Sequence, residues 1–246
     1  HMAVTEVPAP AAGEVLIKVA YAGVNRPDCL QRSGRYPPPP GASPILGLEA
    51  SGHVVAVGEG VTHLKAGDRA AYASAPPGSY CEARVMPAKN VCKLPDNISF
   101  ETAAGMMLKG MTAQYLLRRT YKVQKGDTIL FHAAAGGVGL IACQWAKVLG
   151  LQLIATAGTD AKCQLALANG AAHAINYATE DFAARVKEIT AGQGVKVVYD
   201  SVGKDTWDKS LDCLRPFGLM ASFGNASGVV PPFAPGILGP KGSLYV

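Results

Sequence analysis

The sequence predicts an α/β protein in which a mostly-β region precedes a doubly wound parallel sheet. The first observation is that strand and helix signals alternate along residues 128–223. The second is that the residues before about 105 carry short strand signals, many glycines and prolines, and little helix. Strands that alternate with helices are typical of parallel pairing with right-handed crossovers, whereas short strands between turn signals are typical of an all-β domain.

The parallel region begins with a glycine turn. Residues 128–132 form an apolar run that predicts a buried strand, and an apolar helix signal starts at Leu140. Two glycines lie between the strand and the helix signal. Gly136 would let the backbone approach a pyrophosphate, and Gly139 would let the helix pack closely on the strand. The N–H groups and positive dipole end of the helix would hold the phosphates. Ala134 replaces the first glycine of the G-x-G-x-x-G pattern, so a plain tight turn is the alternative.

Strand and helix signals then repeat in the order of a Rossmann-type sheet. We expect strands at residues 128–132, 151–157, 172–176, 195–200 and 218–223, and helices at 140–149, 161–169, 180–190 and 205–214. In the first region we expect strands at residues 14–22, 51–57, 69–73 and 82–86. The helical stretch 100–119 contains the predicted boundary, which divides the chain into domains 1–105 and 106–246.

Composition and charge exclude several classes of protein. With 49% hydrophobic and 17% charged residues, the chain can bury a core and is not disordered. Its net charge of +5 comes from dispersed residues, which predicts no nucleic-acid partner but suits an anionic nucleotide. The six cysteines form no C-x-x-C pair, which predicts reduced thiols and a cytoplasmic location. The uncharged run 128–146 contains glycines, a histidine and a glutamine, which favours strand, turn and helix over a membrane span.

Several longer motifs are specific enough to indicate a family. They are VNRPD (24–28), GRYPPPPGASPILGLEASGHV (34–54), AGDR (66–69), KGMTAQYLL (109–117), FHAAAGGVGLIACQWAK (131–147), INY (175–177), VVYDSVG (197–203) and SFGN (222–225). These motifs resemble those of the quinone oxidoreductases, the zeta-crystallin-like, zinc-free branch of the medium-chain dehydrogenase/reductase superfamily. The resemblance implies that residues 1–105 form an incomplete GroES-like catalytic domain and residues 106–246 a Rossmann dinucleotide-binding domain.

The resemblance also implies that the chain is truncated at both ends. Relatives carry an extra strand segment ahead of Thr5 and continue beyond residues 242–246, a run that forms a sheet strand in them. An equivalent strand pairs across a dimer in relatives. We therefore expect the complete protein to be a homodimer with residues 242–246 at its interface, because a sheet edge is exposed unless it is paired.

Zinc is not expected at the catalytic site. Zinc-dependent relatives carry a cysteine ligand near the position of Asn25 and a histidine ligand in a Gly-His-Glu motif, where this chain has Leu48 before Glu49. A zinc site needs three or four converging nitrogen, sulfur or oxygen ligands, and one carboxylate is not a site. His53 and His63 have no partner at ligand spacing and are expected to be structural.

Without a metal, the electrophile that would stabilise an alkoxide is missing. This favours hydride donation to a quinone or an enone, whose developing oxyanion needs only hydrogen bonds. By resemblance, the catalytic residues are Asn25 and Tyr36, in the cleft near the nicotinamide. The Asn25 amide would donate to the nicotinamide carboxamide or the substrate oxygen, and the Tyr36 phenol would donate to an oxyanion or pack on the ring. The alternatives are that Asn25 is a turn residue and Tyr36 a core aromatic.

The resemblance implies an NADPH site at the carboxyl ends of the strands, where ligands of open parallel sheets bind. Its residues would be Asn25, Tyr36, Thr112, Gly136, Gly137, Val138, Gly139, Gly158, Thr159, Lys162, Tyr177, Ser201, Phe223 and Gly224. NADPH is expected over NADH because no acid ends the second strand, and Asp160, at an expected helix cap, would point elsewhere. Lys162 is alternatively a solvated helix residue, and Asp200 is interpreted as a strand-end cap.

The function that follows is NADPH-dependent reduction of quinones or related conjugated carbonyls by an NADPH:quinone oxidoreductase. One alternative is an NADPH-binding protein with little or no turnover, either crystallin-like or inactive through truncation. Another is an enone or alkenal reductase. The expected partners are a small-molecule quinone or enone and a second copy of the chain, with no nucleic acid and no membrane.

Overall fold

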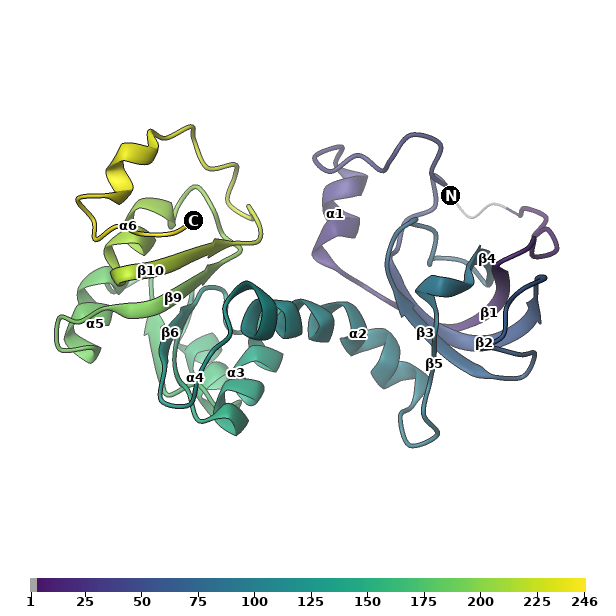
Figure 1. The fold of residues 1–246 in the computed structure, drawn as a ribbon, viewed down its shortest axis with the longest axis horizontal. Coiled ribbons are helices and arrows are strands. Elements are labelled where there is room, and N and C mark those ends of the chain that lie inside the picture. Colours follow the sequence, from purple (N-terminus) through teal and green to yellow (C-terminus); the bar gives the residue numbers. More distant parts are fainter. Residues whose placement is uncertain (1–3) are drawn as a thin grey trace. The chain divides into compact units, whose positions relative to one another are not determined.

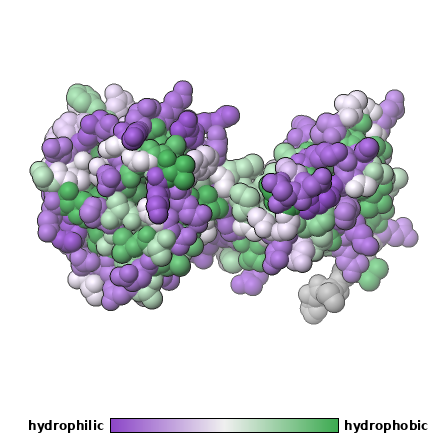
Figure 2. All heavy atoms as spheres, turned by 90° about the horizontal axis from the view of Figure 1, so that it is seen from below, coloured by the Kyte–Doolittle hydropathy of each residue, from purple (hydrophilic) through white to green (hydrophobic). Residues whose placement is uncertain are grey.

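The computed structural model describes residues 4–246 and contains two compact units, of which the first ends at Lys109 and the second begins at Gly110 (Figure 1). Helix α2 (Phe100–Tyr115) runs through this division. Within the described residues, no helix is long and apolar enough to cross a membrane. Figure 2 shows polar residues interspersed with small apolar patches on one face of the protein.

The first unit is built on an antiparallel sheet of five strands in the order β4-β1-β2-β3-β5. The strands are β1 (Glu14–Gly23), β2 (Glu49–Val57), β3 (Arg69–Ala73), β4 (Ala83–Pro87) and β5 (Cys92–Lys93). They curve around a core that includes the fully buried side chains of Ile17, Tyr72 and Met86 (Figure 1). The expected mostly-β region is therefore present, with β2 starting two residues earlier than predicted.

Three short elements of this unit were not predicted: β5, the 3-10 turn Ala88–Asn90 and helix α1 (Arg26–Arg32). The start of α1 has a local cause. The Asp28 carboxylate accepts a hydrogen bond from the backbone N–H of Asn25 at 2.8 Å, which satisfies a donor just before the helix. Pro27 lies in the first turn, where a backbone N–H would have no partner in the helix.

The second unit is a parallel sheet of five strands in the order β10-β9-β6-β7-β8. Its elements are β6 (Thr128–Phe131), α3 (Gly137–Leu149), β7 (Gln152–Ala157), α4 (Asp160–Ala168), β8 (His173–Asn176), α5 (Phe182–Ile189), β9 (Val195–Asp200), α6 (Trp207–Asp212) and β10 (Leu214–Ser222). The direction of strand succession reverses between β6 and β9. Open α/β sheets bind ligands at such a reversal, beyond the carboxyl ends of the strands.

Both faces of this sheet are covered, which explains the continuous apolar strands. Phe131 and Leu153 pack in one cluster with Ala142 and Ala146 of α3. Leu130, Ile154 and Val198 face the other way and pack with α5 and α6. Successive strand residues point to opposite faces, so adjacent residues of β6 serve both layers. The predicted doubly wound fold is confirmed.

The predicted bounds of α3, α6 and β10 differ most from the structure. Helix α3 begins at Gly137, inside the glycine turn, rather than at Leu140, and α6 is shorter than residues 205–214. Strand β10 begins at Leu214 rather than 218, with an irregular register against β9 before Leu219. Phe217 has a left-handed backbone with φ 58°, and this irregularity lies inside β10 rather than before it.

Residues 242–246 lie beside β10. The Met220 N–H donates to the Tyr245 carbonyl at 2.8 Å, and the Tyr245 N–H donates to the Gly218 carbonyl at 2.9 Å. These bonds form a single parallel bridge between Leu219 and Tyr245 rather than a full strand. The bridge extends the sheet by one short segment beyond β10.

Candidate active site

The glycine turn leaves backbone donors unpaired at the start of α3. Gly136 is the N-cap, and its own N–H donates to the Ala133 carbonyl at 2.9 Å. Within residues 4–246, the N–H groups of Gly137, Val138 and Gly139 have no acceptor. Unpaired donors at the positive end of a helix dipole favour an anion. The geometry therefore suits a pyrophosphate, which stays a prediction for these residues.

Gly139 has no room for a side chain. A Cβ at this position would lie 2.5 Å from the Ala134 Cα and 2.5 Å from the Ala134 carbonyl oxygen. The close approach is to the turn rather than to the strand, which refines the role predicted for this glycine. Ala134 is fully buried, and its N–H donates to the Thr156 carbonyl at 3.0 Å. The turn is thereby fixed to β7 although its first motif glycine is absent.

The ends of β7 and β8 bring together the residues predicted to contact the adenosine end. A Cβ at Gly158 would lie 2.8 Å from the Tyr177 phenol oxygen. Thr159 caps α4, because its hydroxyl oxygen accepts from the Lys162 N–H at 3.3 Å and keeps its own hydrogen to donate. The Lys162 side chain is exposed. These positions form one group at neighbouring strand ends.

Asp160 was expected at the helix cap, and that placement was wrong. The cap is Thr159, and Asp160 is the first residue of α4. Its carboxylate accepts from the Asn176 amide at 2.7 Å. Asp160 therefore has a structural partner at the end of β8.

The ends of β9 and β10 bring together Ser201, Phe223 and Gly224. A Cβ at Gly224 would lie 3.0 Å from the Ser201 carbonyl oxygen, and the Phe223 N–H donates to the Asp200 carbonyl at 2.8 Å. The buried Asp200 carboxylate accepts from the Val202 N–H at 2.6 Å, so Asp200 is a strand-end cap, as expected.

Sequence reasoning did not single out His132, which is fully buried directly after β6. Its Nδ1 lies 2.8 Å from the Thr156 hydroxyl, and its Nε2 lies 2.9 Å from the Ser210 hydroxyl. Burial lowers the pKa of His132 to about 4, although the nearby Asp200 carboxylate opposes that shift. The ring is therefore neutral near pH 7 and joins β6, β7 and α6 through hydrogen bonds.

The predicted catalytic residues of the first unit have different surroundings. Asn25 is 6% exposed, whereas the Tyr36 side chain is 55% exposed, so the alternative that Tyr36 is a core aromatic is wrong. Asn25 is the cap residue that precedes α1, so its backbone lies in a turn, as the alternative interpretation proposed. Its side chain also forms hydrogen bonds, which that alternative does not explain. Thr112 lies in α2 in the second unit and is partly exposed.

The Asn25 side chain is held by two charged groups. Its amide nitrogen donates to Glu49 Oε2 at 2.7 Å, and its amide oxygen accepts from Lys109 Nζ at 2.8 Å. Glu49 is fully buried, and its other oxygen accepts from the Leu108 N–H at 2.7 Å. Lys109 Nζ lies 3.4 Å from Glu49 Oε2. Lys109 and Glu49 were not among the predicted site residues, although Lys109 opens the family motif at residues 109–117 that also contains Thr112.

Asp28 forms a second buried contact beside this group. The carboxylate is 3% exposed, and its Oδ2 accepts from the Tyr80 phenol at 2.7 Å. Burial and the bond to Asp28 raise the pKa of Tyr80 above its usual range, so the phenol stays protonated. Asp28 Oδ1 has no hydrogen-bond partner within the described residues.

The residues at the position where zinc-dependent relatives carry their ligands suit an ion pair better than a divalent cation. The Lys109 ammonium already supplies a positive charge at the Glu49 carboxylate. His53 packs edge-on against Phe100, and His63 lies 3.1 Å from the Ala88 carbonyl, which are structural contacts. Across residues 4–246, no three His, Cys, Asp or Glu side chains form a group that could hold a metal. The absence of zinc stays a prediction.

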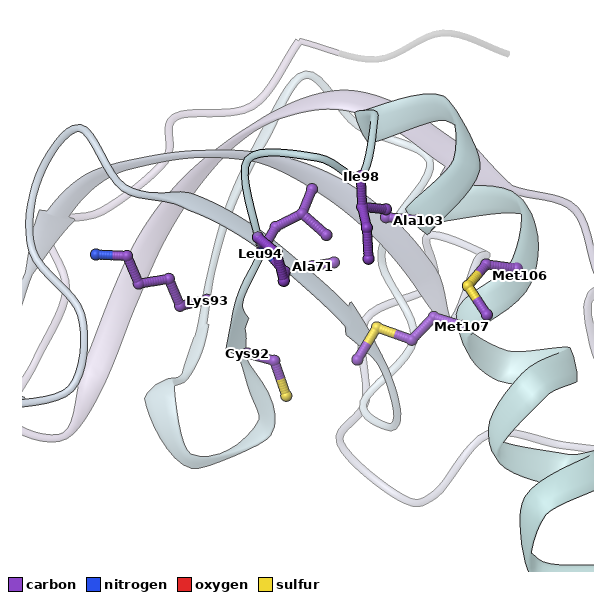
Figure 3. A pocket seen from close by; sticks show the side chains of 9 residues that line it. Ala71, Cys92, Lys93, Leu94, Ile98, Ala103, Met106 and Met107 are labelled. Atoms are coloured by element: carbon purple, nitrogen blue, oxygen red, sulfur yellow. The ribbon is translucent and has the colours of Figure 1, made fainter.

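The first unit also contains a cavity of about 190 Å³ (Figure 3). It is lined by Ala71, Cys92, Lys93, Leu94, Pro95, Ile98, Ala103, Met106 and Met107. Figure 3 shows the Lys93 side chain extending away from the others, so the remaining lining is apolar. None of the predicted site residues lines this cavity. Ligand pockets usually carry placed polar groups that orient the ligand, so the cavity is no candidate for the site.

The reversal of strand order, the glycine turn and the unpaired helix donors are those of a Rossmann-type fold. Comparison with known families agrees: residues 11–129 match the alcohol dehydrogenase GroES-like domain, and residues 137–241 match the zinc-binding dehydrogenase family. The predicted GroES-like nature of the first region is thus confirmed.

Individual relatives are more specific. The chain is 55% identical to a quinone oxidoreductase of Pseudomonas aeruginosa, over 96% of this chain and 73% of that protein. It is 47% identical to a 2-haloacrylate reductase of a Burkholderia species, over 98% of this chain and 74% of that protein. The crystal structure of Escherichia coli quinone oxidoreductase complexed with NADPH superposes with a TM-score of 0.94 at 54% identity, covering 99% of this chain and 74% of that one. The chain belongs to the quinone oxidoreductases of the medium-chain dehydrogenase/reductase superfamily.

Proposed function

We propose that this chain is an NADPH-dependent oxidoreductase that reduces quinones or related conjugated carbonyls without a metal. The observation that carries the proposal is the 54% identity to the Escherichia coli quinone oxidoreductase complexed with NADPH, over 99% of this chain. The site is consistent with the proposal. The unpaired N–H groups at the start of α3 suit the phosphates of the cofactor, and the Glu49 carboxylate pairs with the Lys109 ammonium group rather than with a metal.

NADPH would supply the hydride, and the residues of this chain would bind, orient and donate protons or hydrogen bonds. The N–H groups of Gly137, Val138 and Gly139 would hold the pyrophosphate, with Gly136 allowing the close approach. The residues at the ends of β7 and β8 would hold the adenosine end, namely Gly158, Thr159, Lys162 and Tyr177. Phe223 and Gly224 would lie near the nicotinamide end, and Thr112 and Ser201 would also contact the cofactor.

Asn25 and Tyr36 would serve the reacting end. Reduction of a quinone places negative charge on a carbonyl oxygen, and that charge is stabilised by hydrogen-bond donors. The Tyr36 phenol is exposed and can reach a ligand, whereas the Asn25 amide is buried and fixed by Glu49 and Lys109. The Tyr36 phenol and the Asn25 amide would then both donate hydrogen bonds to the oxyanion.

The first test is steady-state oxidation of NADPH with a panel of acceptors. The panel contains a benzoquinone, a naphthoquinone, a simple enone and a 2-haloacrylate, the last because of the similarity to 2-haloacrylate reductase. Turnover with the quinones supports the proposal. Turnover restricted to the enone and the haloacrylate would favour the alkenal reductase instead. NADPH binding without turnover would favour a nucleotide-binding protein.

A second test addresses the metal. Elemental analysis of protein purified without chelator is expected to find no stoichiometric zinc, because Leu48 stands where the family's histidine ligand is expected and Lys109 contacts Glu49. About one zinc per chain, or activity that is lost on chelation and restored by zinc, would contradict metal-independent chemistry.

We also infer that the protein forms a homodimer and acts in the cytoplasm. Tyr245 and Val246 are 60% and 55% exposed beside β10, where a symmetric copy could extend the sheet. The six cysteines lack the spacing of a disulfide framework, which suits a reducing compartment. Light scattering tests the dimer, and a monomer at micromolar concentration would refute it.

A further inference from the structure

Lys109, Glu49 and Asn25 form a connected group in which every acceptor lies within reach of a donor. Lys109 Nζ donates to Asn25 Oδ1 at 2.8 Å and lies 3.3 Å from the Val24 carbonyl and 3.4 Å from Glu49 Oε2. Asn25 Nδ2 donates to Glu49 Oε2 at 2.7 Å. Glu49 is fully buried, and the Lys109 side chain is 22% exposed. The group therefore lies largely out of solvent.

The chemistry of these partners fixes the orientation of the Asn25 amide. An ammonium group only donates hydrogen bonds, and an ionised carboxylate only accepts them. The Asn25 oxygen must therefore face Lys109, and its nitrogen must face Glu49. The reversed amide would place two donors against each other at Lys109 and two acceptors against each other at Glu49.

This orientation leaves one hydrogen of the Asn25 NH2 group available. The amide nitrogen carries two hydrogens, of which Glu49 accepts one. Within residues 4–246, the amide nitrogen donates a hydrogen bond to Glu49 alone, so its second hydrogen has no partner there. The Lys109 ammonium group beside the amide oxygen also polarises the Asn25 amide, and this strengthens its N–H as a hydrogen-bond donor.

We propose that Lys109 is a positioning residue for the reduction: together with Glu49 it locks the Asn25 amide so that the free N–H hydrogen donates to the substrate oxygen that gains negative charge. This inference rests on the proposed function. Lys109 acts through Asn25 and transfers no proton itself. The ion pair thus gives a metal-free site a fixed, polarised donor in place of a Lewis acid.

The competing explanation is that the pair only stabilises the fold. Lys109 belongs to α2, Glu49 to β2, and Asn25 to the turn before α1, so the same contacts join three segments of the first unit. Removing one member of a buried pair leaves an uncompensated charge and destabilises the protein whatever its role in turnover. The test must therefore separate stability from the rate of turnover.

The experiment compares four variants of the full chain with the parent: Lys109→Arg, Lys109→Met, Glu49→Gln/Lys109→Met and, as a control, Lys89→Met. Lys89 is an exposed lysine of the same unit, and its side-chain amine has no hydrogen-bond or ion-pair partner among the described residues. Thermal unfolding, the Kd of NADPH by fluorescence titration, and kcat and KM with a naphthoquinone are measured for each.

Lys109→Met is expected to lower kcat by about tenfold or more while the Kd of NADPH changes by less than about threefold. Lys109→Arg retains the positive charge and should recover most of that loss. The double variant removes the unpaired carboxylate, so its unfolding temperature should return toward that of the parent. Its kcat should stay low, because the glutamine amide introduced at position 49 donates hydrogen bonds and would favour the reversed Asn25.

The outcomes discriminate between the explanations. A double variant with parental stability and a kcat within about twofold of the parent would overturn the inference and leave Lys109 a structural residue. Parental behaviour of Lys109→Met in all measurements would overturn it as well. A parent that oxidises NADPH with none of the acceptors would instead refute the proposed function, and the inference with it.

Discussion

The Tyr177 phenol lies directly over Gly158, so that a Cβ at position 158 would be 2.8 Å from the phenol oxygen. The two residues follow different strands, Gly158 after β7 and Tyr177 after β8. The contact makes one surface from two neighbouring strand ends, with the Thr159 hydroxyl and the exposed Lys162 side chain on the same segment. If the adenosine ribose binds here, as predicted, the Thr159 hydroxyl, the Lys162 ammonium and the Tyr177 phenol would suit a 2′-phosphate.

Lys162→Ala is expected to weaken NADPH binding by about tenfold and to leave NADH binding nearly unchanged. A charge-assisted hydrogen bond is worth about 1.5–3 kcal/mol, and exposure of Lys162 favours the lower end. Isothermal titration of both nucleotides measures the difference. Only NADPH carries the phosphate that the lysine would contact.

The matched control for this prediction is Lys187→Ala, an exposed lysine near the end of α5 that lies in no predicted site. It removes the same charge from the second unit and should change neither affinity. Equal losses of NADPH and NADH affinity in Lys162→Ala would mean that Lys162 does not contact the 2′-phosphate.

Gly139→Ala is expected to destabilise the second unit by about 2 kcal/mol or more, since overpacking against a rigid backbone forces the helix or the turn to move. The added Cβ would lie 2.5 Å from the Ala134 Cα, which belongs to the buried turn rather than to a flexible side chain. Urea unfolding measures the loss, and NADPH affinity should fall with it because the N–H groups of α3 are displaced.

Gly105→Ala is the control for that change. Gly105 lies in helix α2, and a Cβ there would meet no atom within 4 Å. The same substitution should therefore stabilise the protein by about 0.5–1 kcal/mol through helix propensity. A Gly139→Ala variant that is as stable as Gly105→Ala would contradict the packing role given to Gly139.

The sequence predicted the second unit well because its local signals agree with its tertiary structure. Its buried strands read as continuous apolar runs, and Gly150 ends α3 in the left-handed conformation that glycine adopts freely. The start of β10 was missed because the helix was predicted to reach residue 214, whereas the strand begins there and contains Pro216 and Phe217 with an irregular register. Helix α1 was missed because only seven residues form it and its cap depends on Asp28.

The candidate site was predicted only in part, because some of its contacts join distant segments. Gly136, Gly139 and Asn25 lie in motifs that carry a local signal. The ion pair between Lys109 and Glu49 joins residues 60 positions apart, and His132 bonds to Ser210 across 78 positions. Single-sequence patterns contain no information on such pairs, so Lys109 and His132 became visible only in the structure.

Tyr36→Phe and Asn25→Ala are each expected to lower kcat more than NADPH affinity. Oxyanion donors are worth about 3–4 kcal/mol when they are preorganised and shielded, and the exposed Tyr36 should show less than the buried Asn25. Steady-state kinetics with a naphthoquinone and fluorescence titration of NADPH provide the comparison. If both variants keep kcat within about twofold of the parent, neither residue has the proposed role.

His132 is expected to make the protein less stable as the pH falls below neutrality. Burial lowers its pKa to about 4 in the folded state, against about 6.5 in the unfolded chain. The unfolded state therefore binds a proton first, and stability that is fully present above pH 6.5 is lost as the pH falls toward the folded pKa. The linkage amounts to about 2 kcal/mol at pH 5 and about 3 kcal/mol at pH 4.

The measurement is urea unfolding at several pH values for the parent and for His132→Gln, in which the titrating ring is absent. The amide of the variant can still contact Thr156 and Ser210, so it is expected to fold, though less stably than the parent at pH 7. The other titratable groups of the chain are the same in both proteins, so the difference between the two pH profiles reports on the ring at position 132. The stability of the parent should fall more steeply between pH 6.5 and 4, and the two curves should converge.

Parallel curves would contradict the prediction. Only a ring that is neutral in the folded state and charged in the unfolded state makes the two pH profiles differ. Parallel curves would therefore mean that His132 is also protonated in the folded protein.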